Sequence, residues 1–483
     1  MSDRYFYFTL GPVQGFVSQA RRTRDFWGGS FLLSWLSGCA MLAVKKQGGK
    51  ILFPLADDAY LNWIEGIENG DKPRQGNIPN RFKAEVGGNF NPEQVVETVN
   101  SAWKALAQEV WDEDLQGVAG EETEEIWDRQ HQAFWEIAWA ETDDEKDSSL
   151  LDRVKNWRTH LSPDEPGVKC MVMDGWQELS AASGPGKGVK TFWDDVRSKG
   201  KKGMRTDLRE GENICAIAFV KRRFAHYFEQ LSMDMPGGWK LQGWALEAGV
   251  PSVQYMAAAR WLETAYRKGD SADAAAFHQA ANALTQGYGE WATDLQCLRD
   301  FSNTGEGKRL TSLDGGVFFE SLLENRNLWD DTRQAEKVKT LLVAWRRSAQ
   351  LDPVSPFYAI LLMDGDSLGK QMSVRENQGH ISAALKGFTQ AVPEVVDEHS
   401  GFLIYTGGDD VLAVLPVEDA FACALALRNC YSEQFKTGPV TSTLSGAIEF
   451  AHIKMPLGKV LGDGGIWRRC DSARDRKTLS FRG

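Results

Sequence analysis

Runs of apolar residues divide the N-terminal part of the chain into predicted strands and helices. The short runs "YFYFTL" (5–10) and "ILFPLA" (51–56) predict strands, and the long stretch between them, 13–46, predicts a helix. Two more strands are predicted near "FKAEV" and at "FWEIAWAE", with a helix over "PEQVVETVNSAWKALAQEVW" between them. The predicted order is β-α-β-β-α-β, the ferredoxin-like arrangement, over residues 1–141.

The same order returns in the C-terminal part, which we place at 351–483. "FYAILLMD", "GFLIY" and "VLAVLP" predict strands, "EDAFACALALRNCYSEQF" predicts a helix, and "VTSTLSGAIEFAHI" predicts the last strand. Residues 142–350 begin as a polar stretch, where "SGPGKGVK" and "RSKGKKGMR" predict flexible basic loops, and continue as helices. We therefore predict an α+β protein with two ferredoxin-like domains separated by a mainly helical insert.

Composition and charge narrow the class of protein. The chain has 483 residues, of which 42% are hydrophobic and 25% charged. We find no apolar run of the roughly 18 residues that span a bilayer and no signal peptide, and we expect a cytoplasmic protein. The net charge of −12 disfavours a chain that holds nucleic acid by itself, since phosphate binding depends on Lys and Arg. A subunit whose partners hold RNA or DNA remains compatible with this charge.

Several common catalytic patterns are absent from the sequence. The seven cysteines contain no CxxC, so neither a disulfide framework nor a complete zinc site is indicated. HExxH, GxSxG and a His-Asp dipeptide are also absent, which disfavours the simplest metallohydrolases and serine hydrolases.

The segment "YTGGDDVLAV" places Asp409 and Asp410 at the tip of a predicted hairpin. Gly and Asp favour such turns on backbone grounds alone, so a turn without further function is one interpretation. In the ferredoxin-like order, however, the first and second strands run parallel, because a right-handed crossover joins them. The hairpin therefore lies at the edge where the first strand ends in "MDGDSLGK". We expect Asp364 and Asp366 to face Asp409 and Asp410 there.

A group of carboxylates at one sheet edge predicts a site for divalent metal. An unscreened pair near 4 Å repels by on the order of 4 kcal/mol at an effective dielectric of 20, and Mg²⁺ or Mn²⁺ would relieve this. Two such ions can clamp the attacking and leaving oxygens of a phosphoryl transfer. We predict that the catalytic and metal-binding residues are Asp364, Asp409 and Asp410. Nucleotide contacts are predicted from glycines that permit close approach, from a helix start and from nearby side chains, namely Gly365, Asp366, Lys370, Gly407, Gly408 and Lys454.

The first copy of the fold lacks these acids. Where the second copy has "MDGDSLG", the first has "LGPVQGF", and it has no GGDD. Acids that served the fold should be present in both copies, so we interpret the first copy as a non-catalytic partner that could supply half of a composite nucleotide pocket. Two alternatives stay open for Arg21, Arg22 and Arg24, which could contact RNA or phosphate or form a solvated helix face. Lys454 could likewise form a salt bridge.

Segments along the whole chain together resemble a known family. They are "LGPVQGFVSQARRTRDFWGGSFLLSWL", "ILFP", "NIPNRF", "FWEIAWA", "GENICAIAFVKR", "FYAILLMDGDSLGK", "YTGGDDVLAVLP" and "GAIEFAHIKMPL". In this order they resemble the large polymerase/cyclase subunit of type III CRISPR effector complexes, in its III-B form, over residues 1 to about 460. The resemblance implies two palm domains that convert ATP into cyclic oligoadenylate when the complex binds target RNA. It also implies other protein subunits as partners, which hold most of the guide and target RNA.

The chain departs from the family pattern in three places. It has no His-Asp motif, so we predict no HD nuclease activity. The stretches that match two CxxC pairs keep only their first cysteines, Cys170 and Cys215, so we expect no zinc. From about residue 462 the basic tail has no helical period, and we expect an aberrant or truncated end. Two other functions remain as alternatives: a catalytically silent scaffold subunit, or a palm cyclase that uses another nucleotide or acceptor.

Overall fold

The computed structural model describes most of the chain. The described residues are 4–68, 70–132, 134–145, 149–156, 163–201, 203–285, 293–329, 331–366, 368–372, 374–436, 438–461 and 479–482.

The N-terminal domain has a four-stranded antiparallel sheet in the order β2-β3-β1-β4. Its strands are β1 (Arg4–Gly11), β2 (Lys50–Phe53), β3 (Arg81–Val86) and β4 (Glu136–Thr142). Its helices are α1 (Gln14–Val17), α2 (Thr23–Lys46), α3 (Asp58–Ile64), α4 (Pro92–Asp114) and α5 (Glu121–Gln132). Both β1 and β2 run antiparallel to β3, so they are parallel to each other, as a helical crossover requires.

The helix predicted over 13–46 is interrupted. The short α1 ends at Val17 and α2 begins at Thr23, because the carboxylate of Asp25 accepts hydrogen bonds from the amides of Arg21 and Arg22 at 3.0 and 3.1 Å. This contact caps the first turn of α2 and separates it from α1.

Helix α2 is the most apolar helix of the N-terminal domain. An 18-residue window of α2 has a mean hydropathy of 1.4, so by length and composition this helix could cross a membrane, contrary to our expectation from the sequence. That window is entirely buried, between the first sheet, α4, α9 (Ala216–Arg223) and the C-terminal sheet. The apolar residues of α2 are therefore accounted for by the protein core.

The insert between the two sheets is mainly helical, as predicted, but its basic stretches are not all loops. Residues predicted as flexible form α7 (Lys187–Lys199) and α8 (Met204–Asp207), because Trp193 and Val196, one turn apart, are buried against the core. A hairpin of β5 (Ser232–Met235) and β6 (Trp239–Gln242) was not predicted. The other helices are α6 (Ser149–Asn156), α10 (Val253–Lys268), α11 (Ser271–Leu284), α12 (Arg299–Ser302), α13 (Gly305–Thr311), α14 (Glu320–Leu323) and α15 (Thr332–Ser348).

The C-terminal sheet has five strands in the order β11-β10-β7-β9-β8. Its elements are β7 (Phe357–Gly365), α16 (Leu368–Met372), α17 (Arg375–Glu398), β8 (Phe402–Gly407), β9 (Asp410–Leu415), α18 (Ala420–Gln434), β10 (Leu444–His452), α19 (Leu457–Leu461) and β11 (Leu479–Arg482). The order β-α-β-β-α-β thus occurs a second time, and the predicted α+β class with helical regions is confirmed. Most of the tail predicted to be aberrant, 462–478 and 483, lies outside the described residues. Residues 479–482 pair in parallel with β10.

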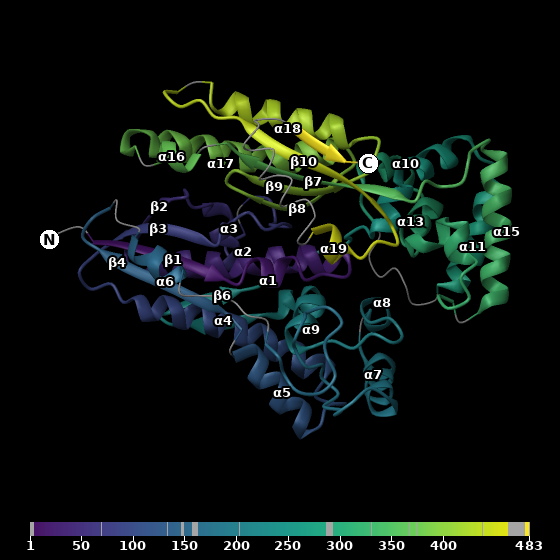
Figure 1. Cartoon of the computed structure of the whole chain (residues 1–483), viewed down its shortest axis with the longest axis horizontal. Helices are drawn as coiled ribbons and strands as arrows, with labels where there is room; N and C mark the ends of the chain where they lie inside the picture. The colour runs from purple at the N-terminus through teal and green to yellow at the C-terminus, as the bar shows by residue number, and fades with distance from the viewer. Residues whose placement is uncertain are drawn as a thin grey trace.

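The two faces of the C-terminal sheet pack against different partners. Tyr358, Ile360 and Leu362 of β7 belong to the core shared with the N-terminal domain and the insert, whereas Ala359 and Leu361 pack under α17 and α18. This alternation is the two-residue period of a strand. The C-terminal sheet therefore lies between its own helices and the rest of the molecule, with β8 beside α2 (Figure 1).

Two ion pairs attach the helical insert to the C-terminal domain. Arg260 of α10 donates to both carboxylate oxygens of Asp419 at 2.8 and 2.7 Å. Arg299 of α12 donates to both oxygens of Asp397 in α17 at 2.6 Å. Bidentate pairs of this kind fix orientation as well as distance.

Candidate active site

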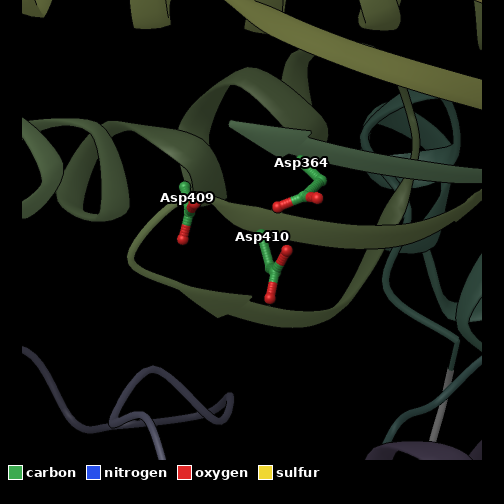
Figure 2. A group of neighbouring side chains, drawn as sticks. All are labelled: Asp364, Asp409 and Asp410. Atoms are coloured by element: carbon green, nitrogen blue, oxygen red, sulfur yellow. The ribbon is translucent and has the colours of Figure 1, made fainter. Parts of the chain in front are cut away.

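The register of two central strands brings Asp364 and Asp410 together. Met363 of β7 pairs with Val411 of β9, so the next step of the same antiparallel register places Asp364 opposite Asp410. Both residues continue the set of alternate positions that face the shared core rather than α17 and α18. Side chains directly opposite on one face have Cβ atoms about 4.5–5.5 Å apart. Figure 2 shows the two carboxylates beside each other, with Asp409 next to them in the turn.

The turn between β8 and β9 delivers Asp409. Gly407 pairs with Asp410, which leaves Gly408 and Asp409 as the two central residues. Gly408 has a φ of +71°. Two-residue hairpin turns require a positive φ at their first central residue, and glycine adopts it most easily. Gly365 on β7 is also sterically required, because a Cβ there would lie 2.7 Å from the Cβ of Asp409. The glycines of the predicted motif therefore allow the acids to approach one another.

The three carboxylates form one compact group. One oxygen from each of Asp364, Asp409 and Asp410 lies within 4.8 Å of the others. Within the described part of the chain, no other group of three or more His, Cys, Asp or Glu side chains is close enough to hold a metal ion. Asp364 is nearly buried, with 9% of its surface exposed, so repulsion among the acids is only partly screened by water.

The donor set fits a hard divalent cation. All three ligand groups are carboxylates, which Mg²⁺ and Mn²⁺ prefer. Opposite ligands of an octahedral Mg²⁺ lie about 4.2 Å apart, given metal–oxygen distances of about 2.1 Å. The observed limit of 4.8 Å therefore requires only a small contraction around one ion.

The structure does not place Asp366 in this group. Its Oδ2 accepts hydrogen bonds from the hydroxyls of Ser445, at 3.0 Å, and Thr443, and its amide donates to the Thr443 carbonyl. Asp366 is therefore not one of the three acids that lie within 4.8 Å of one another, and hydroxyls of the segment 443–445 hold its Oδ2 instead. Its buried Oδ1 has no hydrogen-bond partner among the described residues. A nucleotide contact by Asp366 stays a prediction.

Two tyrosines flank the acids and were missed by the sequence reasoning. Burial, followed by the charges of Asp410 and Asp409, raises the pKa of Tyr405. Burial also raises the pKa of Tyr431, and the nearby acids add to it. Tyr405 could have been noticed, since it opens the GGDD motif. Tyr431 comes from α18, and nothing in the local sequence indicates its position.

The other predicted nucleotide contacts lie in different places. Gly365, Gly407 and Gly408 are at the site, whereas the side chain of Lys370 lies outside the described residues. Lys454 is not near the acids. It follows β10 at the end where His452 pairs with Phe357, whereas Gly365 pairs with Leu444 at the other end. Eight strand steps of about 3.4 Å separate those ends by roughly 27 Å.

The N-terminal domain contacts the hairpin directly. A cavity of about 40 Å³ lies between the two domains beside Gly408. Its lining includes Asp57, Asn77, Leu385 and Lys386. None of Asp364, Asp409 and Asp410 lines this cavity. The composite nucleotide pocket stays a prediction.

The two remnant cysteines lie side by side. The sulfur of Cys170 accepts hydrogen bonds from the amides of Val172, Met173 and Cys215 at 3.3, 3.3 and 3.1 Å. Both side chains are buried, and burial raises the pKa of Cys215 well above its usual value. Burial by itself would raise the pKa of Cys170, but the hydrogen bonds from the Cys215 side chain and from the amides outweigh it and lower that pKa. The absence of zinc stays a prediction.

The fold and the acidic group define the class of protein: an α+β chain that contains a palm domain with a group of carboxylates. Residues 5–110 match the family model described as CRISPR-associated protein Cmr2, N-terminal, and residues 357–476 match that of the Cas10/Cmr2 second palm domain. Both regions of the chain are thus similar to models of the Cas10/Cmr2 family. The palm match extends into the tail that we expected to be aberrant.

Individual relatives agree with the family models. The chain is 23% identical over 528 residues to the CRISPR system Cmr subunit Cmr2 of Pyrococcus furiosus, an alignment that covers 92% of this chain and 57% of the relative. The chain thus spans little more than half the length of that protein. Two structures of a type III-B Cmr-beta complex, apo and bound to cognate target RNA, contain chains that match with TM-scores of 0.60 and 0.62. Both matches are 14% identical in sequence, cover 98% of this chain and 67% and 68% of the solved chains, and show a likeness of fold.

Proposed function

We propose that this chain is the large subunit of a type III-B CRISPR effector complex, with two ferredoxin-like palm domains. In this proposal its C-terminal palm is a nucleotidyltransferase that converts ATP into cyclic oligoadenylate when the complex binds target RNA. The observation that carries the proposal is the convergence of Asp364, Asp409 and Asp410 within 4.8 Å from two strands and a turn. Turn formation alone explains Gly408 but not Asp364.

The reaction joins nucleotides by phosphoryl transfer. The 3′-hydroxyl of one ATP attacks the α-phosphorus of another, and the bond to the leaving pyrophosphate breaks as the new bond forms. A divalent ion held by the three carboxylates would supply the positive charge that stabilises the reacting phosphate oxygens. Asp364 and Asp410 fix two of its ligands on rigid strands, and Gly408 leaves the turn open for close approach of the substrate.

The family resemblance also supports the proposed setting. We propose that other subunits of the complex hold the guide and target RNA, which agrees with the net charge of −12. We propose a cytoplasmic location. We also propose that the chain has no HD nuclease activity, since its sequence has no His-Asp dipeptide.

The direct test uses the assembled complex. It is incubated with target RNA, Mg²⁺ or Mn²⁺ and each labelled nucleoside triphosphate in turn, and the products are identified by mass spectrometry. Cyclic oligoadenylate that forms only with target RNA and ATP supports the proposal. A cyclic product from GTP would show that the enzyme uses another nucleotide. If no product forms under any condition, the chain is a scaffold subunit without catalytic activity.

A further inference from the structure

A second cavity lies far from the acidic group. It has a volume of about 430 Å³ and lies where the start of α2, the segment 206–212, the start of α10 and the segment 453–457 meet. Cavities of 300–1,000 Å³ are typical of small-ligand sites. Because Lys454 lines it, the cavity is at the opposite end of β10 from the acids. We call it the cationic cavity.

The charge of the cationic cavity is opposite to that of the whole chain. Three carboxylates line it, Asp207, Glu212 and Asp314. They face six cationic side chains, which are Arg21, Arg22, Arg24, Arg209, Arg222 and Lys454. The chain as a whole carries a net charge of −12. A local excess of positive charge in an acidic protein attracts anions to this place in particular.

The carboxylates of the cavity are already shared among its arginines. Glu212 forms ion pairs with Arg22 at 2.6 Å and with Arg222 at 3.1 Å. Asp207 pairs with Arg24 at 2.5 Å and with Arg223 behind the wall at 2.7 Å. The three arginines singled out in the sequence therefore do not form a simple solvated face, because two of them are packed against acids of the insert.

The crowding of cations has an electrostatic consequence. Burial, together with the charges of Arg222 and Arg209, lowers the pKa of Arg22 to about 10 although Glu212 raises it. Neighbouring cations destabilise the charged form of an arginine, and an anion that binds beside it stabilises that form.

Two of the lining cations, Arg21 and Lys454, remain available to a ligand. The Arg21 side chain is 47% exposed, and its nearest carboxylate, Glu212, is 3.8 Å away. The Lys454 side chain is exposed and forms no ion pair within the described residues. Neither side chain is needed to neutralise a buried acid. Both could be replaced without breaking the ion pairs beneath them.

The lining indicates which part of a ligand is held. Its one aromatic residue is Tyr255, which is buried and donates its hydroxyl hydrogen bond to the Leu310 carbonyl. The cavity therefore offers no exposed ring on which a base could stack, whereas guanidinium groups bind phosphate in bidentate geometry. We propose that the cationic cavity binds a phosphate-bearing ligand, a free phosphorylated molecule or a strand of RNA, through Arg21 and Lys454.

The test compares the full chain with the double variant Arg21→Gln/Lys454→Gln. Lys268→Gln is the matched control, since Lys268 is exposed at the other end of α10, about 22 Å from the cavity given a rise of 1.5 Å per residue. Two probes are used: inorganic pyrophosphate in titration calorimetry, and a fluorescently labelled, 5′-phosphorylated single-stranded RNA in anisotropy. EDTA keeps the acidic group free of metal, so the outcome is independent of the proposed nucleotidyl transfer.

We expect saturable binding of at least one probe by the parent, about tenfold or more weaker in the double variant and unchanged in Lys268→Gln. Binding of pyrophosphate would identify a free phosphorylated ligand, and binding of the RNA alone would identify a strand. Failure of both probes to saturate, or equal affinity in parent and double variant, would overturn the proposal. Lys454→Gln alone, a change at an exposed position, should give a smaller loss and serves if the double variant is unstable.

Discussion

Gly76 and Tyr405 form a parallel bridge between the N-terminal domain and β8, the edge strand of the hairpin that carries Asp409 and Asp410. The amide of Thr406 donates to the carbonyl of Gly76 at 3.1 Å. Strand β8 would otherwise leave this backbone edge unpaired. The N-terminal domain, which lacks the GGDD motif, therefore supports the strand that leads into Asp409 and Asp410.

The loop that carries Gly76 is itself held by α2. The indole of Trp27 donates to the carbonyl of Arg74 at 2.8 Å, and the hydroxyl of Ser34 accepts from the amides of Asn77 and Ile78 at 3.0 and 2.7 Å. A shift of α2 would consequently move the loop and change the support of β8. We infer that the N-terminal domain positions the hairpin through this contact.

Replacing Gly76 should reduce activity without touching an acid. In Gly76→Ala the new Cβ would lie 2.6 Å from the Ser30 carbonyl oxygen, so the loop must move and the bridge to Tyr405 weakens. We expect a loss of about 1–3 kcal/mol in the free energy of unfolding and a fall in nucleotide product. Both are measured on the same preparation, by urea unfolding of the chain and by product formation in the complex.

Gly87→Ala is the control for that change. A Cβ at Gly87, in the loop after β3, would meet nothing within 4 Å. Product formation equal to the parent in both variants would show that the bridge does not position the hairpin.

The double change Asp409→Ala/Asp410→Ala should abolish nucleotide product and leave the fold intact. The acids repel one another in a hairpin turn, so their removal should change the free energy of unfolding by no more than about 1 kcal/mol in the absence of metal. Product is measured with target RNA present and the parent alongside. Glu124→Ala/Glu125→Ala removes two adjacent exposed acids elsewhere and should keep activity. If the Asp409/Asp410 variant forms as much product as the parent, the two acids have no catalytic role and the motif serves only as a turn.

Divalent metal should stabilise the C-terminal domain. An ion that binds only the folded state raises the melting temperature by mass action, and saturation at about 100 times Kd contributes about 2.7 kcal/mol. We expect the parent to melt at a higher temperature in millimolar Mn²⁺ than in EDTA. In Asp364→Asn this difference should shrink, since one charged ligand is lost. Identical melting of the parent in both buffers would contradict a metal site.

Zinc should be well below one atom per chain. Cys170 and Cys215 provide only two thiols, which are too few ligands for a closed tetrahedral site. Elemental analysis of purified protein measures this directly. One zinc per chain that is lost in Cys170→Ala would show that further ligands complete the site.

The ion pair between Asp25 and Arg222 should make stability depend on pH in the acid range. Burial by itself would raise the pKa of Asp25, but the charge and hydrogen bonds of Arg222 outweigh it and hold the pKa well below its ordinary value of 3.8. Because the folded pKa is the lower one, the pair contributes its full stability above about pH 4 and loses it as the pH falls further.

Removal of one partner tests the same pair. At neutral pH, Asp25→Asn should lower the free energy of unfolding by about 3–5 kcal/mol, because Arg222 stays buried with less compensation. Asp58→Asn is the control, since Asp58 pairs with Lys45 at 2.5 Å but is 65% exposed, and it should cost less than about 1 kcal/mol. Urea unfolding at pH 7 and near pH 3, below the ordinary pKa of the carboxyl, measures both effects. A difference between Asp25→Asn and the parent that does not shrink toward acid pH would contradict the assigned pKa direction.

The sequence by itself determined the repeated β-α-β-β-α-β order and the position of the acidic turn. Local patterns were sufficient for this, because apolar runs of strand length, helical periods and the Gly-Gly-Asp-Asp turn are each readable within a few residues. It also indicated which copy carries the acids. The break between α1 and α2 and the helix α7 escaped this reasoning, because each depends on a capping or burial contact that periodicity does not reveal.

Only the tertiary structure decided which residues meet. Asp364 and Asp366 are equivalent in the sequence pattern, yet the register of β7 against β9 places Asp364 opposite Asp410, while the Asp366 carboxylate accepts hydrogen bonds from the hydroxyls of Thr443 and Ser445. Lys454 follows a strand end as predicted, but the antiparallel pairing of β10 with β7 puts it at the far end of the sheet. Register and strand direction arise from contacts between residues distant in the chain, and a shift by one residue reverses which side chains share a face.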